Sequence, residues 1–158
     1  MSLKSITDAI AADLALSVTG VAFGFGGENV DQHGDAPRIV WVPRGGPMSA
    51  PQGPGQNPRP LWAWEQRVEA HVWGRSTSPT ATTADHFAAA EALLNALVAS
   101  AHHVAHGAYR LGSAEWPVLN SQQMAYGRVV VAEFVFQVPL VDSTTGTARA
   151  KTTTTHVI

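Results

Sequence analysis

The stretch 82-TTADHFAAAEALLNALVASAHHVAHG-107 decides how the chain is organised, because it is the one long uninterrupted helical signal in the sequence. Alanine, which has the best intrinsic helix propensity, dominates it. The apolar residues recur every three or four positions and predict one buried face, made of Phe87, Ala90, Leu94, Leu97, Ala101 and Val104. A helix of this length is roughly 35 Å long and crosses a small sheet. We therefore expect a sheet packed against it.

Both ends of this stretch carry helix-terminus signals. Thr82 or Thr83 can accept a hydrogen bond from a free backbone N–H of the first turn, and Asp85 places negative charge at the positive end of the helix dipole. At the other end, Gly107 can adopt the left-handed conformation that ends a helix. These signals predict a helix over residues 82–107.

Apolar segments on both sides of the helix supply the sheet. Residues 3–16 repeat Leu and Ile at helical spacing and predict an amphipathic helix. The β-branched, aromatic and alternating patterns elsewhere predict four strands, over residues 38–43, 61–74, 109–119 and 128–141. The predicted fold class is α+β, with a mostly antiparallel four-stranded sheet, the long helix across one face and an N-terminal helix.

The remaining segments are predicted to be irregular. Residues 18–34 are rich in Gly and predict a flexible loop with Phe23 and Phe25 turned inward. Residues 44–60 hold five Pro and four Gly and predict a long exposed loop or arm. The Thr-rich residues 143–158 predict a tail that is flexible or ordered by a partner. We therefore expect one domain over residues 1–142, followed by this tail.

Composition excludes several classes of function. The 158-residue chain has no cysteine, which excludes disulfides, thiolate zinc sites and thiol catalysis. Its ten Lys and Arg are scattered and nearly balanced by twelve acids, a pattern that disfavours binding to duplex DNA. Only 14% of residues are charged, against about 25% in a typical soluble domain. Either neighbouring subunits cover part of the surface, or the surface is rich in Thr, Ser and Gly.

The N-terminus and the hydropathy pattern bear on location. Asp8 and Asp13 interrupt the N-terminal segment, which does not have the texture of a signal peptide, and no stretch approaches the roughly 18 apolar residues of a membrane span. We expect a protein made in the cytoplasm.

The last predicted strand is apolar on both faces. Val129, Val131 and Val135 share one face with Glu133 and Gln137, although the solvent face of a strand is normally polar. Either another layer of the same chain covers these valines, for which the helix over residues 3–16 is available, or another subunit does.

Two sets of residues are candidates for a metal site or for acid–base catalysis. His102, His103 and His106 form an HHxxH pattern, and the i, i+4 pair can share a metal ion. No acid follows to complete the site, so we interpret them as cations that are favoured at a helix C-terminus. Glu91 and Glu133 are candidates for a buried carboxylate pair. As interface ion-pair partners they have three arginines available, Arg67, Arg110 and Arg128.

The order and texture of these segments resemble the tail terminator proteins of long-tailed bacteriophages. The resemblance rests on the strand RIVWVP (38–43), the Pro/Gly arm, a strand ending in EAHVWG (69–74), the helix AEALLNAL (90–97, with Ala90 first), a strand ending in EWP (115–117) and the strand closing in QVPLVD (137–142). It covers residues 3–142 and implies a structural virion protein rather than an enzyme, with no cofactor and no metal.

The resemblance also implies partners. Such proteins form a hexameric ring that caps the head-proximal end of the tail tube, ends tube polymerisation and meets the head-completion proteins, while DNA passes through without sequence-specific contact. The expected location is the virion neck. The expected subunit or partner interface comprises Arg44, Arg59, Trp62, Trp64, Arg67, Glu69, Val129, Val131, Glu133 and Val135. Two alternatives stay open: another neck protein or tail-tube subunit, and a small metal- or ligand-binding domain that uses the histidines.

Overall fold

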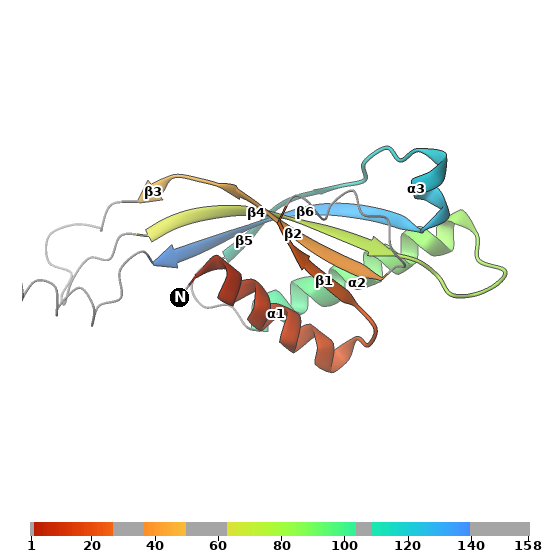
Figure 1. The fold of residues 1–158 in the computed structure, drawn as a ribbon, viewed down its shortest axis with the longest axis horizontal. Coiled ribbons are helices and arrows are strands. Elements are labelled where there is room, and N and C mark those ends of the chain that lie inside the picture. Colours follow the sequence, from red (N-terminus) through yellow and green to blue (C-terminus); the bar gives the residue numbers. More distant parts are fainter. Residues whose placement is uncertain (1, 27–36, 50–62, 104–108, 140–158) are drawn as a thin grey trace, which may run out of the picture.

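A computed structural model describes residues 2–26, 37–49, 63–103 and 109–139 of the chain (Figure 1). The helices of this part are α1 (Leu3–Ser17), α2 (Thr83–His103) and α3 (Ser121–Ala125). The strands are β1 (Ala22–Phe25), β2 (Arg38–Gly45), β3 (Met48–Ser49), β4 (Ala63–Gly74), β5 (Tyr109–Glu115) and β6 (Arg128–Pro139). Residues 143–158 and residues 50–60 of the predicted 44–60 arm lie outside the described residues.

One twisted sheet forms the body of the fold, with strand order β1-β2-β4-β6-β5 and the two-residue β3 paired to β4. The α+β class is confirmed, but the four-stranded antiparallel sheet is wrong. β1 runs parallel to β2, so the sheet is mixed, while β2, β4, β6 and β5 are successively antiparallel. The fifth strand comes from a glycine-containing segment that the sequence pattern assigned to a loop.

Both long helices lie on the same side of the sheet, as Figure 1 shows below the strands. α1 begins at a capping box in which Ser2 and Ser5 exchange side-chain-to-backbone hydrogen bonds, which satisfies N–H groups of the first turn. Its apolar stripe, Ile6, Ile10 and Leu14, is at most 1% exposed and belongs to the main core. The helix over residues 3–16 therefore does not cover the valine face of the last strand.

α2 packs across β4 and β6 at very close range. A Cβ placed on Gly74 would lie 2.3 Å from Cα of Ala90, so glycine on the strand and alanine on the helix permit the two backbones to approach. Thr82 and Asp85 close the N-terminus of the helix by reciprocal hydrogen bonds, and these bonds lower the pKa of the Asp85 carboxyl. The described helix ends at His103.

The buried stripe of α2 differs from the predicted one. Leu93 and Leu97 are buried, whereas Phe87 is 36% exposed and Leu94 is half-buried. Alanine lies on every side of this helix, so the sequence permits several rotations of it. The close contact at Gly74 selects one of them. Val104 lies outside the described residues.

Aromatic side chains fill the space between helices and sheet. The indole of Trp41 packs edge-on against Phe134 and Phe136, with ring centroids 5.5 and 6.3 Å apart. The Nε1–H of Trp41 is buried and has no hydrogen-bond partner among the described residues. The side of the sheet that faces α1 and α2, called here the helix face, is thus predominantly apolar, with Gln66 as a buried polar residue beside Phe136.

The other departures from the sequence prediction are short elements. Arg44 and Gly45 extend β2 and Met48–Ser49 forms β3, so the start of the 44–60 segment is not a loop. Residues 120–127, which link β5 to β6 and were assigned no helix or strand from the sequence, contain the one-turn helix α3, which begins at an Asn120 capping box. Segments this short carry no periodicity of their own, and local capping and pairing create them.

Candidate functional site

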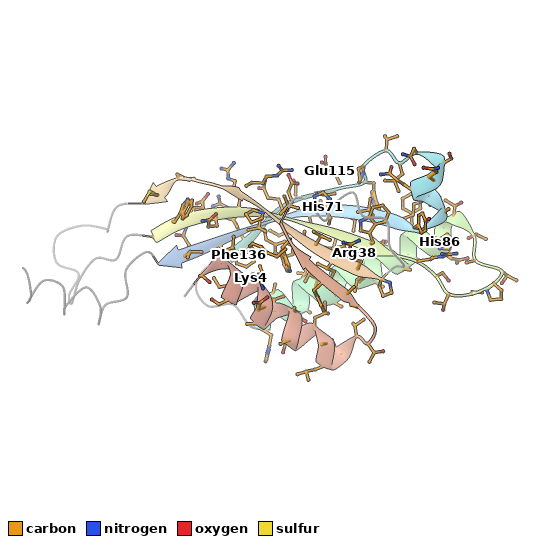
Figure 2. All side chains as sticks on the ribbon, in the orientation of Figure 1. Lys4, Arg38, His71, His86, Glu115 and Phe136 are labelled. Atoms are coloured by element: carbon orange, nitrogen blue, oxygen red, sulfur yellow. The ribbon has the colours of Figure 1, made fainter. Side chains whose placement is uncertain are left out.

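The side of the sheet turned away from α1 and α2, called here the open face, is the candidate functional surface. Alternation along each strand places every second residue there. In Figure 2, His71 and Glu115 are labelled on this side, and Phe136 and Lys4 on the helix side. Its main members are Val40, Val42, Arg44, Glu65, Arg67, Glu69, His71, Trp73, Arg110, Glu115, Val129, Val131, Glu133, Val135 and Gln137.

An ion-paired row crosses the open face at Glu69. Its Oε2 accepts a hydrogen bond from Nη2 of Arg44 at 2.8 Å and lies 3.1 Å from Nε2 of His71. The hydrogen bond from Arg44 lowers the pKa of the Glu69 carboxyl and raises that of the Arg44 guanidinium. Both contacts hold Glu69 in its charged form within a half-buried row.

A second row lies two residues along β4. Glu65 accepts a hydrogen bond from Arg110 of β5 at 3.2 Å, and Nε of Arg67 lies 3.8 Å from the same carboxylate oxygen. Arg110 and Glu65 are separated by β6, so the pair spans three strands. The row links one edge of the sheet to its centre.

Glu133 breaks this pattern of opposite charges. It faces Glu69 directly in the β4–β6 register. A Cβ placed on Gly112 would lie 2.4 Å from Oε1 of Glu133, so the Glu133 side chain lies over the β5 backbone at Gly112. Like charges directly opposite on a sheet destabilise it. A partner that supplies a cation here would relieve that repulsion.

Valines and one Trp form the floor beneath these charges. Val40, Val129 and Val135 are at most 4% exposed, and Trp73 is 7% exposed. Trp116 to Leu119 and Met124 border Val129 at one end of the face. The open face therefore combines a closely packed apolar floor with charged groups tied to one another. This combination is typical of a surface that meets another protein.

The predicted interface residues divide into three groups. Arg44, Arg67 and Glu69 lie together on the open face, beside the predicted residues of β6, which are Val129, Val131, Glu133 and Val135. Trp64 lies on the other side of β4, where its Nε1 donates a hydrogen bond to the carbonyl of Gly46 at 2.8 Å. Arg59 and Trp62 lie outside the described residues.

The candidate chemical groups are not brought together. Glu91 is exposed on α2 and Glu133 lies on the opposite side of the sheet, so they form no carboxylate pair. His102 and His103 are exposed, and Nδ1 of His103 lies 3.1 Å from Oδ1 of Asp13 on α1. His106 is not among the described residues, and within the described ranges no three His, Cys, Asp or Glu side chains are placed to hold a metal ion.

An exposed apolar cluster was missed by the sequence reasoning. Phe87 stacks edge-on against Trp116 at 4.7 Å between ring centroids, and the Arg128 guanidinium lies 5.4 Å from the centroid of the Phe87 ring. Val118 is 99% exposed and Trp116 is 42% exposed, beside a hollow of about 280 Å³. The run EWPVL was interpreted as the end of a strand. The Pro117 within it was the available signal that the strand stops earlier.

Comparison of the sequence with known protein families and with curated proteins gave no match. None of the helices that the structure describes is long and apolar enough to span a membrane. The function proposed next therefore rests on the surfaces described above and on the order of the elements.

Proposed function

We propose that this protein is a structural component of a bacteriophage virion that caps the head-proximal end of the tail tube and ends its polymerisation. The observation that carries the proposal is the open face, where an apolar floor is crossed by two rows of paired charges. The charged side chains supply specific polar groups that fix the register of a protein contact, and the half-buried Val131 adds apolar surface between them.

The order of elements supports the same assignment. Apart from the short elements β1, β3 and α3, a helix, two strands around a Pro/Gly-rich segment, a long helix and two further strands follow one another as in the tail terminator resemblance. In this proposal the protein acts as a homo-oligomer, with a hexameric ring expected, and its partners are the tail-tube protein and the head-completion proteins. The protein is made in the host cytoplasm and resides in the virion neck.

The near-neutral charge suits a ring through which DNA passes. With a formal net charge of −2, the chain carries little of the phosphate-neutralising charge that holds proteins on DNA. The arginines of the open face are also engaged with carboxylates, as Arg44 is with Glu69 and Arg110 with Glu65. The described part of the chain therefore offers few free cations with which to hold DNA that passes through the ring.

The test is the mass of the full-length protein by light scattering across a concentration series, with electron microscopy of the same samples. Rings of about six subunits that do not grow further support the proposal. Long filaments would assign the protein to the tube itself. A protein that stays monomeric at every concentration would contradict the ring.

A pair of variants tests whether the open face makes the contact with a partner. Val131→Asp places a charge on the half-buried floor of that face, and Leu16→Asp places the same charge on an 86% exposed position of α1. We expect Val131→Asp to weaken binding to the ring or tube partner at least tenfold, and Leu16→Asp to leave it unchanged. Circular dichroism of both variants should show the same fold.

A further inference from the structure

The sheet ends in two different edges, β1 on one side and β5 on the other. β1 runs in the direction of β2 and β6, whereas β5 runs in the direction of β4. When identical sheets follow one another around a closed ring, β5 of one copy therefore meets β1 of the next in antiparallel orientation. This is the orientation in which two edge strands pair most readily.

The helices do not cover the two edge strands equally. α1 lies beside β1, and the two elements enclose a cavity of about 320 Å³. Phe23 and Phe25 of β1 line it together with the buried Trp41. At the opposite edge, Leu111 of β5 is 44% exposed. One edge thus has a recess whose strand side is lined by Phe23, Phe25 and Trp41 and whose helix side carries Lys4, Thr7 and Asp8. The other edge has an apolar side chain without full cover.

The recess and Leu111 lie on the same side of the sheet. Leu111 is opposite Phe134 and Phe23 is opposite Ile39, and both of these partners belong to the helix-side core. If the sheet of one copy continues into the next, its two faces stay on their own sides. Leu111 of the incoming β5 then points toward the cavity rather than toward the open face.

The polar groups at the cavity favour an uncharged occupant. Lys4 and Asp8 of α1 are paired with each other, so they contribute no net charge, and the Lys4 ammonium lies 5.7 Å from the Phe25 ring centroid. Trp41 also lines the cavity, but its Nε1–H is buried and is therefore not offered as a donor to an occupant. An aliphatic side chain fits these surroundings better than an anion or a cation does.

We propose that β5 of a second copy adds antiparallel to β1 and seats Leu111 in the cavity between α1 and β1. This inference rests on the proposed ring and identifies the contact that closes it. The contact is head-to-tail, because each copy uses β5 on one side and β1 on the other. The open face then runs around the whole ring and stays available to the tube and neck partners.

The absence of cysteine from the chain makes this contact testable by cross-linking. Ala22 of β1 and Ser113 of β5 are small, exposed residues that flank the proposed contact and leave Phe23 and Leu111 intact. The double variant Ala22→Cys/Ser113→Cys is oxidised mildly and analysed on non-reducing gels. We expect a ladder of covalent oligomers. An equal mixture of the two single variants should give dimers and nothing larger.

Two further variants test the role of Leu111 in the cysteine background. Leu111→Glu should reduce cross-linking at least tenfold, because a carboxylate cannot replace the apolar contact with Phe23, Phe25 and Trp41, and Lys4 is already paired with Asp8. Met48→Glu, a charge at the 59% exposed Met48 of β3, should leave the ladder unchanged. A ladder that survives Leu111→Glu, or no cross-linking beyond the single-cysteine level, would overturn the proposal.

The outcome can be separated from that of the proposed function. Rings seen by electron microscopy without the β1–β5 cross-link would mean that another surface closes the ring, and the capping function would stand. A cross-linked ladder in a protein that forms long filaments would support this contact and reject the capping function.

Discussion

The two sides of the sheet are built from the same strands but do different work. The helix face holds the largest buried side chains, among them Trp41 and Phe134, and contacts α1 and α2. The open face alternates valines with charged groups that pair across strands. The bulky aromatic core therefore lies on one side of β4 and β6, while the other side adds a layer of buried valines beneath charged groups that are available for specific contacts. The predictions below test that division.

The largest expected effect is on the helix face. Phe134→Ala should lower the free energy of unfolding by about 3–5 kcal/mol, because it empties a fully buried site between Trp41 and Phe136. Gln137→Ala, on the open face of the same strand, should change it by about 0.5 kcal/mol or less. Urea unfolding followed by Trp fluorescence measures both. If the two variants lost similar amounts of unfolding free energy, the two faces would contribute equally to stability and the proposed division would be wrong.

Two neighbouring residues of β6 that lie on opposite faces of the sheet test the same division with matched substitutions. Val130 is 2% exposed on the helix face, and Val131 is half-buried on the open face. Val130→Thr should cost about 1–3 kcal/mol, because it buries a hydroxyl in an apolar core. Val131→Thr has the same shape change and should cost under about 0.5 kcal/mol. If Val131→Thr lowers the free energy of unfolding as much as Val130→Thr does, water is excluded from the open face as fully as from the core.

The third effect is electrostatic and depends on pH. Arg44→Met keeps the aliphatic stem and removes the partner of Glu69, so stability at pH 7 should fall by under about 1 kcal/mol. The hydrogen bond from Arg44 lowers the pKa of Glu69 in the folded state. The stabilisation by the Arg44–Glu69 pair is therefore fully present above the pKa that Glu69 has in the unfolded chain, and it is lost as the pH falls through its lower pKa in the folded protein. Wild type and variant should therefore converge once the pH lies below the lowered native-state pKa of Glu69.

A matched variant accompanies this prediction. Arg67→Met removes a cation that lies 3.8 Å from Glu65, a weaker geometry than the 2.8 Å contact of Arg44 with Glu69. Its effect in urea unfolding at pH 7 should be the smaller of the two. A loss for Arg44→Met that stays constant down to acid pH would show that packing of the side chain, and not the charge on Glu69, is responsible.

Much of the fold follows from the sequence, because periodicity and alternation are local. The helix over residues 3–16 and the strands near 38–43, 61–74 and 128–141 are found with small shifts at their ends. β1 could not be predicted, because AFGF is short, contains glycine and becomes a strand only through pairing with β2. Its strand state is decided by tertiary contact rather than by propensity.

Which residues of one strand share a face was predictable from the sequence, but their pairing with residues of other strands was not. Alternation placed Arg67 and Glu69 of β4 on one face and the valines of β6 on one face. That Arg44 pairs with Glu69, and that Glu133 faces Glu69, depends on the register between strands, which a pattern within one strand does not contain. The exposure of Phe87 likewise depended on how α2 is rotated over Gly74.

The smallest effect should come from the like-charged pair on the open face. Glu133→Gln removes one of two carboxylates that face each other across β4 and β6, so it should stabilise the protein by about 0.2–0.5 kcal/mol at pH 7. The gain in stability from Glu133→Gln should be larger in the Arg44→Met background, because Glu69 has then lost its main compensating cation. A double-mutant cycle measures this coupling. Glu115→Gln, at an exposed position opposite Val131, should be neutral. A loss of stability in Glu133→Gln would mean that its carboxylate above Gly112 is favourable in the isolated protein, and that the open face carries no stored repulsion for a partner to relieve.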